Sequence, residues 1–468
     1  MDRNINYKHA TLAVALAIIS AAVACRSGVR LPAADDIVEG RVVVPVDTIE
    51  EGTTVSLEHN RYSLRKSVID SRDFWESIAI LDVASADAAA RTMDQRTFSL
   101  ALTRLMLSDP DGASVAFRAL HLKAGDPAVR ARARIGLTMA LSWKSDWPAL
   151  AAIGIDRDSA ETADPEVAHA GVERWGRALF DVPMPVMDVP SSPVTLPMRR
   201  SAFGTPVVTV RVNGVAREFW LDTGASMTLL SDEVAVASGV KLAARDTLAL
   251  SVVAGHIPAR AVFIDSLAIG PMVARGIGAA LVTRGALRLD HRVVNGTEEE
   301  VNIDGVIGTD VLRHLDLVID AAAGTITISR PRQNLRTVRN LFWVGYPVVR
   351  MIAKDGRALL FGLDTGAEGT YVTTTLLRKH PDTPVAMRRG SIRGLGTEEH
   401  RTEWVARWFA LSDGDYSMTL RNMPVAPERH WTFLLFDGVL GSDVALASRM
   451  HLDFQNGVFE MRQSSSPH

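Results

Sequence analysis

Two short acidic motifs offer the most specific chemistry in this sequence. Both read Asp-Thr-Gly-Ala, one beginning at Asp222 and the other at Asp364, and each follows a short apolar run. A carboxylate at the end of a buried strand is held rigidly, and the glycine two residues later lets the chain turn without a side chain in the way. If the two loops meet, their carboxylates can share one proton, so that one acts as a general base and the other as an acid.

The surroundings of the two motifs repeat at matched spacing. The motif aspartate follows Pro206 by 16 residues in the first half and Pro347 by 17 in the second, and a turn lies between them in each case. Downstream, residues 304–310 read Asp-Gly-Val-Ile-Gly-Thr-Asp and residues 437–443 read Asp-Gly-Val-Leu-Gly-Ser-Asp. Spacing that recurs within one chain predicts an internal duplication.

The elements that must position these motifs are strands. From about residue 200, short runs of Val, Ile, Leu and Thr alternate with Gly, Asn and Asp turns, which is typical of an all-β region. Within it, Asp304 and Asp437 each precede a glycine, and an Asp-Gly pair is usually a turn. We therefore interpret these two aspartates as structural.

Over about residues 200–463 the sequence resembles aspartic proteases, specifically the retroviral-type lobe, which has Asp-Thr-Gly-Ala after an apolar strand and a hydrophobic-Gly segment near its end. Retroviral-type enzymes build one active site from two identical lobes. This sequence is similar to a single-chain pair of such lobes, which implies a bilobal fold. The resemblance also implies an endopeptidase that acts on extended peptides or proteins through a dyad of Asp222 and Asp364, with no metal or other cofactor.

The resemblance assigns roles to the neighbours of the dyad as well. By this resemblance, the active-site loops are supported by Thr223, Gly224, Thr365 and Gly366, and the two threonines hydrogen-bond across the interface. The segments of Gly308 and Gly441 are expected to pack behind these loops. Candidates for substrate contact are Ala225, Ser226, Ala367 and Glu368, although a surface role is equally open for Ser226 and Glu368. Flaps that close over substrate are expected within 253–259 or 390–396, and no tyrosine of the pepsin-like flap type lies between the motif Asp222 and Asp304.

The single cysteine of the chain lies at the end of an apolar segment near the N-terminus. Arg3 and Lys8 precede an apolar run over residues 10–23, which is the layout of a secretory signal. The small residues before Cys25 resemble a bacterial lipobox, which implies cleavage before Cys25, lipidation of its sulfur, and anchoring of the exported protein in a bacterial membrane, in the periplasm or at the cell surface. An ordinary signal or anchor helix with an incidental cysteine is the alternative.

Composition excludes several other classes of function. The 468 residues are 47% hydrophobic and 22% charged, with a formal net charge of −3, so a bulk electrostatic partnership with nucleic acid is not expected. One cysteine permits no internal disulfide, no cysteine-based zinc site and no iron–sulfur cluster. The absence of a His-Glu-x-x-His motif disfavours a metalloprotease.

The sequence predicts an α+β multidomain protein, with an N-terminal helical domain followed by an all-β, bilobal domain. Asp109-Pro110 and Asp126-Pro127 read as helix starts, and they indicate an N-terminal helical domain, either tetratricopeptide-like or a plain bundle, that could dock a protein partner. A short strand is expected at 41–46. The predicted divisions are 1–24 (signal), 25–66 (tether), 67–180 (helices), 181–200 (proline-rich linker), 201–335 (first lobe) and 336–463 (second lobe).

Two functional hypotheses follow. The first is an exported, lipid-anchored aspartic endopeptidase with an intramolecular dyad. The second is a non-catalytic periplasmic lipoprotein that uses the same fold to bind peptides or to assist assembly. A variant of the first pairs the lobes between molecules, and its activity would fall on dilution.

Overall fold

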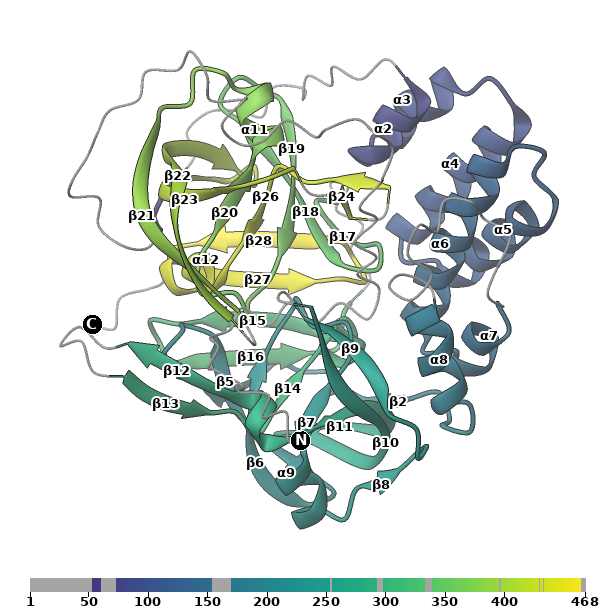
Figure 1. Cartoon of the computed structure of the whole chain (residues 1–468), viewed down its shortest axis with the longest axis vertical. Coiled ribbons are helices and arrows are strands. Elements are labelled where there is room, and N and C mark those ends of the chain that lie inside the picture. Colours follow the sequence, from purple (N-terminus) through teal and green to yellow (C-terminus); the bar gives the residue numbers. More distant parts are fainter. Residues whose placement is uncertain are drawn as a thin grey trace, which may run out of the picture.

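A computed structural model describes residues 53–59, 73–153, 170–252, 255–292, 298–332, 339–394, 397–428, 430–431 and 433–463. Helices form one side of the molecule and β-sheets form the rest (Figure 1). Cys25 and the strand expected at 41–46 lie outside the described residues. No helix among the described residues is both long enough and apolar enough to cross a membrane.

The described helices lie within residues 74–151 and 170–178, and each packs on the next along the chain. Asp109 and Asp126 accept hydrogen bonds from the first turns of their helices and are followed by proline at the first helical position, as the sequence predicted. Whether the helices dock a partner, and whether they are tetratricopeptide-like, stay predictions. Their bounds are α2 (Phe74–Ala79), α3 (Val83–Ala89), α4 (Met93–Met106), α5 (Pro110–Lys123), α6 (Pro127–Lys144), α7 (Trp147–Ala151) and α8 (Ala170–Ala178).

The motif at Asp222 follows a strand of a ten-stranded sheet, in which β14 runs parallel to β6. Its strands are β2 (Val186–Asp188), β4 (Arg199–Arg200), β5 (Pro206–Val212), β6 (Val215–Leu221), β7 (Leu229–Ser231), β8 (Lys241–Leu242), β9 (Leu248–Val252), β10 (Gly255–Ile269), β11 (Met272–Val282) and β14 (Gly305–Ile307). The same half contains α9 (Asp232–Ala237), a 3₁₀ turn η1 (Arg284–Leu287), the hairpin β12 (Arg288–Arg292) and β13 (Glu298–Asn302), and α10 (Thr309–Leu312).

The motif at Asp364 follows a strand of a nine-stranded sheet in which the arrangement recurs, with β26 parallel to β19. Gly438 pairs with Phe361 here as Gly305 pairs with Phe219 in the first half. The strands are β1 (Thr54–His59), β17 (Leu341–Trp343), β18 (Pro347–Ala353), β19 (Ala358–Leu363), β20 (Tyr371–Thr373), β21 (Val385–Gly394), β22 (Thr397–Ser412), β23 (Tyr416–Ala426) and β26 (Gly438–Leu440). This half also contains α11 (Thr374–Lys379), the hairpin β24 (His430–Trp431) and β25 (Leu434–Leu435), and α12 (Ser442–Ala447).

A five-stranded sheet joins the two halves, with the order β28-β27-β15-β16-β3. Its strands are β3 (Val194–Pro197), β15 (Asp316–Asp320), β16 (Thr325–Ser329), β27 (Arg449–Asp453) and β28 (Val458–Arg462). The central pairing is between β15 of the first half and β27 of the second. Backbone hydrogen bonds therefore hold the two halves together (Figure 1).

The proline-rich segment 181–200, which the sequence suggested as an extended linker, contains three short strands. β2 pairs with β11 at one edge of the ten-stranded sheet, and β3 pairs with β16 at one edge of the five-stranded sheet. Edge strands tolerate prolines because one side of the strand needs no N–H donors. The predicted tether likewise includes β1, which pairs with β23. Pattern alone could not find these pairings because they are non-local.

The helices and sheets share one continuous hydrophobic core. Phe98 of α4 packs edge-on against Phe433, with ring centroids 5.5 Å apart, and Trp143 of α6 packs against Trp343 at 5.2 Å. The buried indole of Trp175 in α8 donates to Ala249 O at 3.2 Å. The helical region is thus packed against both halves of the β-rich part.

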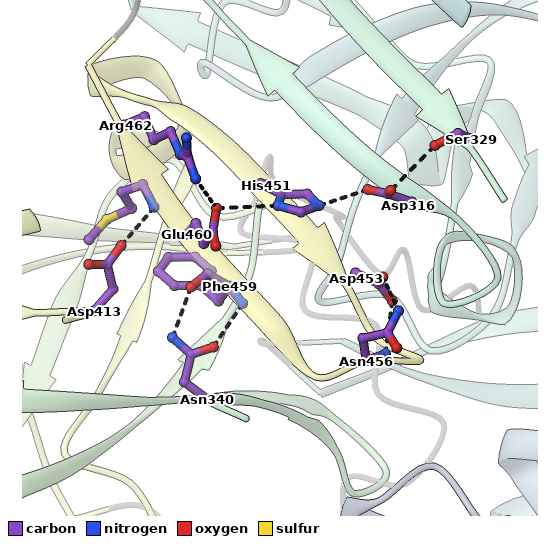
Figure 2. Close-up of polar contacts among 11 residues, drawn as sticks. Asp316, Ser329, Asn340, Asp413, His451, Asp453, Asn456, Phe459, Glu460 and Arg462 are labelled. Carbon is purple, nitrogen blue, oxygen red and sulfur yellow. Dashed lines mark hydrogen bonds and ion pairs between the residues drawn. The ribbon is translucent and has the colours of Figure 1, made fainter. Parts of the chain in front are cut away.

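A charged cluster lies across the five-stranded sheet (Figure 2). His451 of β27 contacts Asp316 of β15, with Nε2 to Oδ1 at 2.7 Å, and its Nδ1 lies 3.6 Å from Glu460 Oε2. Arg462 also pairs with Glu460. Burial by itself would lower the pKa of His451, but the hydrogen bonds to Asp316 and Glu460 outweigh it and raise the pKa to about 9.

Because of this cluster, we expect the free energy of unfolding to decrease as the pH rises above neutral. Because the folded-state pKa of His451 lies above its ordinary value of 6.5, its contribution is complete below pH 6.5 and is lost as the pH rises through about 9. Allowing for partial exposure, the free energy of unfolding should fall by about 1–2 kcal/mol over this range. Urea unfolding of His451→Gln should lack this decline, whereas the exposed His256→Gln should retain it. An unchanged decline in His451→Gln would contradict the assignment.

Candidate active site

The two motif loops meet with their carboxylates facing each other. Asp222 follows β6 and Asp364 follows β19, and their side chains are 0% and 2% exposed. A Cβ added at Gly224 would lie 2.4 Å from Asp364 Oδ1, and one at Gly366 would lie 2.4 Å from Asp222 Cγ. Each loop therefore needs glycine at this position because the carboxylate of the other loop lies against its backbone.

Reciprocal hydrogen bonds between the motif threonines connect the two loops. The N–H of Thr223 donates to Thr365 Oγ1 at 3.0 Å, and the N–H of Thr365 donates to Thr223 Oγ1 at 3.0 Å. Each hydroxyl then donates to the opposite strand, Thr223 to Leu363 O at 2.9 Å and Thr365 to Leu221 O at 2.8 Å. All of these bonds are buried, so the loops are fixed relative to each other.

Removing one hydroxyl of this network should destabilise the whole chain. In Thr223→Val, the buried Leu363 O and Thr365 N–H lose their partner, which should lower the free energy of unfolding by about 2–4 kcal/mol in urea. The matched control is Thr195→Val, whose hydroxyl is exposed and contacts Thr327, and its change should stay within about 0.5 kcal/mol. Equal effects of the two variants would argue against a fixed junction.

Asp222 accepts few hydrogen bonds for a fully buried carboxylate. Its Oδ1 accepts from the N–H of Gly224 at 2.7 Å, and its Oδ2 has no hydrogen-bond partner among the described residues. Burial raises the pKa of Asp222 well above its ordinary value, and the nearby charge of Asp364 raises it further. Both effects oppose ionisation of this carboxyl in the folded chain.

Asp364 accepts more hydrogen bonds. Its Oδ1 accepts from the N–H groups of Gly366 and Ala367, both at 3.0 Å, and its Oδ2 accepts from the hydroxyl of Tyr346 at 3.3 Å. Burial raises the pKa of Asp364 to about 6, and a hydrogen bond with the Asp222 side chain, followed by the bonds from Ala367, Gly366 and Tyr346, limits the rise. The pair is therefore able to hold one proton and one negative charge.

Two threonine–aspartate pairs support the loops, and the sequence analysis missed them. Asp310 accepts from the N–H and the hydroxyl of Thr228, both at 2.9 Å. Asp443 accepts from Thr370 in the same way, at 2.8 and 2.7 Å. The available signal was that a threonine follows the motif aspartate by six residues in both halves, and that each downstream segment ends in aspartate.

The downstream glycine segments pack directly behind the loops. The N–H of Thr309 donates to Ala225 O at 2.7 Å, and the N–H of Ser442 donates to Ala367 O at 2.8 Å. Both alanine side chains are buried. Ala225 and Ala367 are two of the four candidates for substrate contact. Their carbonyl oxygens already accept hydrogen bonds from other parts of the chain.

The other two candidates lie nearer to solvent. Ser226 is half-buried and Glu368 is exposed, and the hydroxyl of Ser442 donates to Glu368 O at 3.0 Å. Of the four candidates on the two motif loops, Ser226 and Glu368 are therefore more accessible to a substrate than the two alanines.

Asp304 and Asp437 occupy matching structural positions. Asp304 pairs with Arg284 at 2.8 Å and accepts from the N–H of Glu218. Asp437 pairs with Lys379 at 2.8 Å and accepts from the N–H of Leu360. Each aspartate makes these contacts within its own half, in keeping with the structural interpretation.

The two stretches named as flap candidates lie on antiparallel hairpins. β9 pairs with β10 in the first half, and β21 pairs with β22 in the second. Their tips, 253–254 and 395–396, lie outside the described residues. The hydrogen bond from Trp175 to Ala249 O fixes the base of the first hairpin to helix α8.

Comparison with known protein families finds a match over the region that contains the first motif. The sequence model of the family described as Aspartyl protease matches residues 208–311, which contain the first motif. These residues are similar to that family, as the resemblance predicted. The second motif lies outside the match, so its assignment depends on the recurring geometry.

Among solved structures, the chain matches the crystal structure of a retropepsin-like aspartic protease from Rickettsia conorii. The two are 18% identical, the match covers 31% of this chain and 98% of that chain, and the TM-score is 0.22. No curated protein matches this chain.

Proposed function

We propose that this chain is an aspartic endopeptidase whose two β-rich halves act as the lobes of one intramolecular active site. The observation that carries the proposal is the buried pair of Asp222 and Asp364, each packed against the motif glycine of the other loop. The pairing of β15 with β27 supports it because this joins the two halves within one chain.

The geometry suits a water-mediated hydrolysis. The ionised carboxylate removes a proton from a water molecule, whose oxygen attacks the carbonyl carbon of the peptide bond. The protonated carboxyl donates to the carbonyl oxygen and stabilises the charge that develops there. Collapse of the tetrahedral intermediate breaks the C–N bond. The carboxyl that took the proton of water gives it to the leaving amine, and a hydroxyl of the intermediate returns a proton to the other carboxylate as the carboxylic acid product forms. The two carboxyls supply every proton transfer, so the reaction needs no cofactor.

Export and lipid anchoring belong to the same proposal. The cationic start, the apolar run and the small residues before Cys25 support a lipoprotein signal. Expression with a radiolabelled fatty acid should label the wild-type chain and not Cys25→Ser. Label retained in the Cys25→Ser variant would exclude lipidation of this sulfur.

Hydrolysis of an unfolded protein by the full chain tests the proposed activity. We expect cleavage that pepstatin blocks, at a pH where one carboxyl of the pair is ionised. Binding of unfolded protein without cleavage at any pH from acid to neutral would favour the peptide-binding alternative instead.

A further inference from the structure

The segments that lead into β5 and β18 occupy matching positions but differ in one side chain. Both segments read Gly-x-Pro, and their glycines have nearly equal φ angles, +86° at Gly204 and +85° at Gly345. The residue between glycine and proline is Thr205 in the first half and Tyr346 in the second. The backbone conformation therefore repeats, whereas the side chain between glycine and proline does not.

A compensating difference lies on the strands that lead to the aspartates. Trp220, two residues before Asp222, is matched by Gly362, two residues before Asp364. A Cβ added at Gly362 would lie 2.7 Å from Tyr346 Cε1. Glycine at this position leaves room for the tyrosine ring. The first half thus pairs a small residue, Thr205, with the large Trp220, and the second half pairs the large Tyr346 with a glycine.

This exchange gives the two carboxylates different surroundings. The Tyr346 hydroxyl reaches Asp364 Oδ2 at 3.3 Å. In the first half, Asp222 Oδ2 and the Oγ1 of Thr205, the residue at the matching position, are both buried without a hydrogen-bond partner among the described residues. A donor favours an ionised carboxylate, whereas an oxygen without donors suits a protonated carboxyl.

Helix α6 holds the segment that carries Tyr346. A Cβ at Gly345 would lie 3.0 Å from Met139 Cγ, so the helix packs directly on this turn. Nearby, Trp343 packs against Trp143 and donates through its indole N–H to Thr309 Oγ1 at 3.3 Å. The tyrosine is therefore held by the helical region as well as by its own half.

We propose that Tyr346 is a positioning residue that makes the dyad asymmetric, so that Asp364 is the ionised base and Asp222 the protonated acid. Asp364 removes the proton from the attacking water, and Asp222 donates to the carbonyl oxygen of the substrate. The inference depends on the proposed function for its catalytic meaning, but the hydrogen bond can also be tested without turnover.

The first test is the pH dependence of kcat/KM for Tyr346→Phe in the full chain. Loss of the donor should raise the pKa of Asp364 and move the acid limb of the profile up by about 0.5–1 pH unit. Activity below that limb should then fall about 3–10-fold, with little change on the plateau. Gly362→Ala should shift the limb in the same direction because its Cβ displaces the ring, whereas Tyr416→Phe should follow the wild type.

A merely structural role would lower activity by the same factor at every pH. That result, or a Tyr346→Phe limb that coincides with the wild-type limb, would overturn the proposal.

The second test measures the free energy of unfolding and needs no activity. The bond to ionised Asp364 stabilises the fold above the pKa of that carboxyl and is lost below it. Tyr346→Phe should therefore cost more stability at pH 8 than at pH 4, both in the wild type and in Asp222→Asn. In Asp364→Asn this pH dependence should vanish.

A pH-independent cost in all three backgrounds would refute the role of Tyr346 even if the chain is a protease. Conversely, a wild type without hydrolysis at any pH would refute the proposed function alone, and this second test would still decide the inference.

Discussion

Replacing Asp364 by Asn is expected to lower kcat/KM for peptide hydrolysis by at least about 10³-fold, and Asp222→Asn should do the same. The asparagine amide can neither accept the proton of water nor give up a proton, so it cannot replace a carboxyl in a pair that must hold one proton and one negative charge. The measurement is cleavage of an unfolded protein substrate by the full chain near the pH optimum of the wild type.

The loss should not reflect unfolding. Because burial raises the pKa of Asp364 to about 6, its contribution to stability is complete below the ordinary value and is lost as the pH rises through 6. Asp364→Asn removes this loss, and the amide oxygen can still accept from Gly366 and Ala367. Its melting temperature at pH 7 should equal or exceed that of the wild type. Wild-type activity in either variant would exclude the dyad.

Removing the helical region is expected to prevent stable folding of the rest. A fragment of residues 201–463 would expose the surfaces that receive α4, α6 and α8, including the contacts at Phe433, Trp343 and Ala249. It would also lack β2 and β3. We expect a non-cooperative urea transition and no activity, because buried apolar surface is the main source of stability.

A single substitution tests the contact between Trp143 of α6 and Trp343 without removing the helices. Trp143→Ala should lower the free energy of unfolding by about 3–5 kcal/mol because it leaves a cavity against Trp343. Leu122→Ala on the exposed face of α5 is the matched control and should stay within about 0.5 kcal/mol. A fragment that folds cooperatively and cleaves substrate at the wild-type rate would show that the helices are dispensable.

Features encoded by local pattern could be predicted from the sequence. The two motifs, their apolar strands and the capped starts of α5 and α6 all depend on residues close together in the chain. The resemblance to retroviral-type lobes also implied that Thr223 and Thr365 would hydrogen-bond across the interface.

Features that depend on distant partners could not be predicted. The residues of β2 and β3 read as a linker because only the sheets beside them supply their hydrogen bonds. Tyr346 carried no signal of its own, since its importance arises from the glycine at position 362 and from the turn of Gly345 beneath helix α6. The indole of Trp175 likewise gains its role from a strand more than 70 residues away.

The central claim is that one chain contains both carboxylates of a single active site, and mixing two inactive variants tests it most directly. Asp222→Asn and Asp364→Asn are purified as full chains, and hydrolysis is measured for each, for their equimolar mixture and for the wild type over a range of dilutions. The account predicts an active wild type whose specific activity is independent of concentration, and a mixture as inactive as its components. Recovery of activity in the mixture would show that the site forms between molecules, and an inactive wild type would show that the pair is not catalytic.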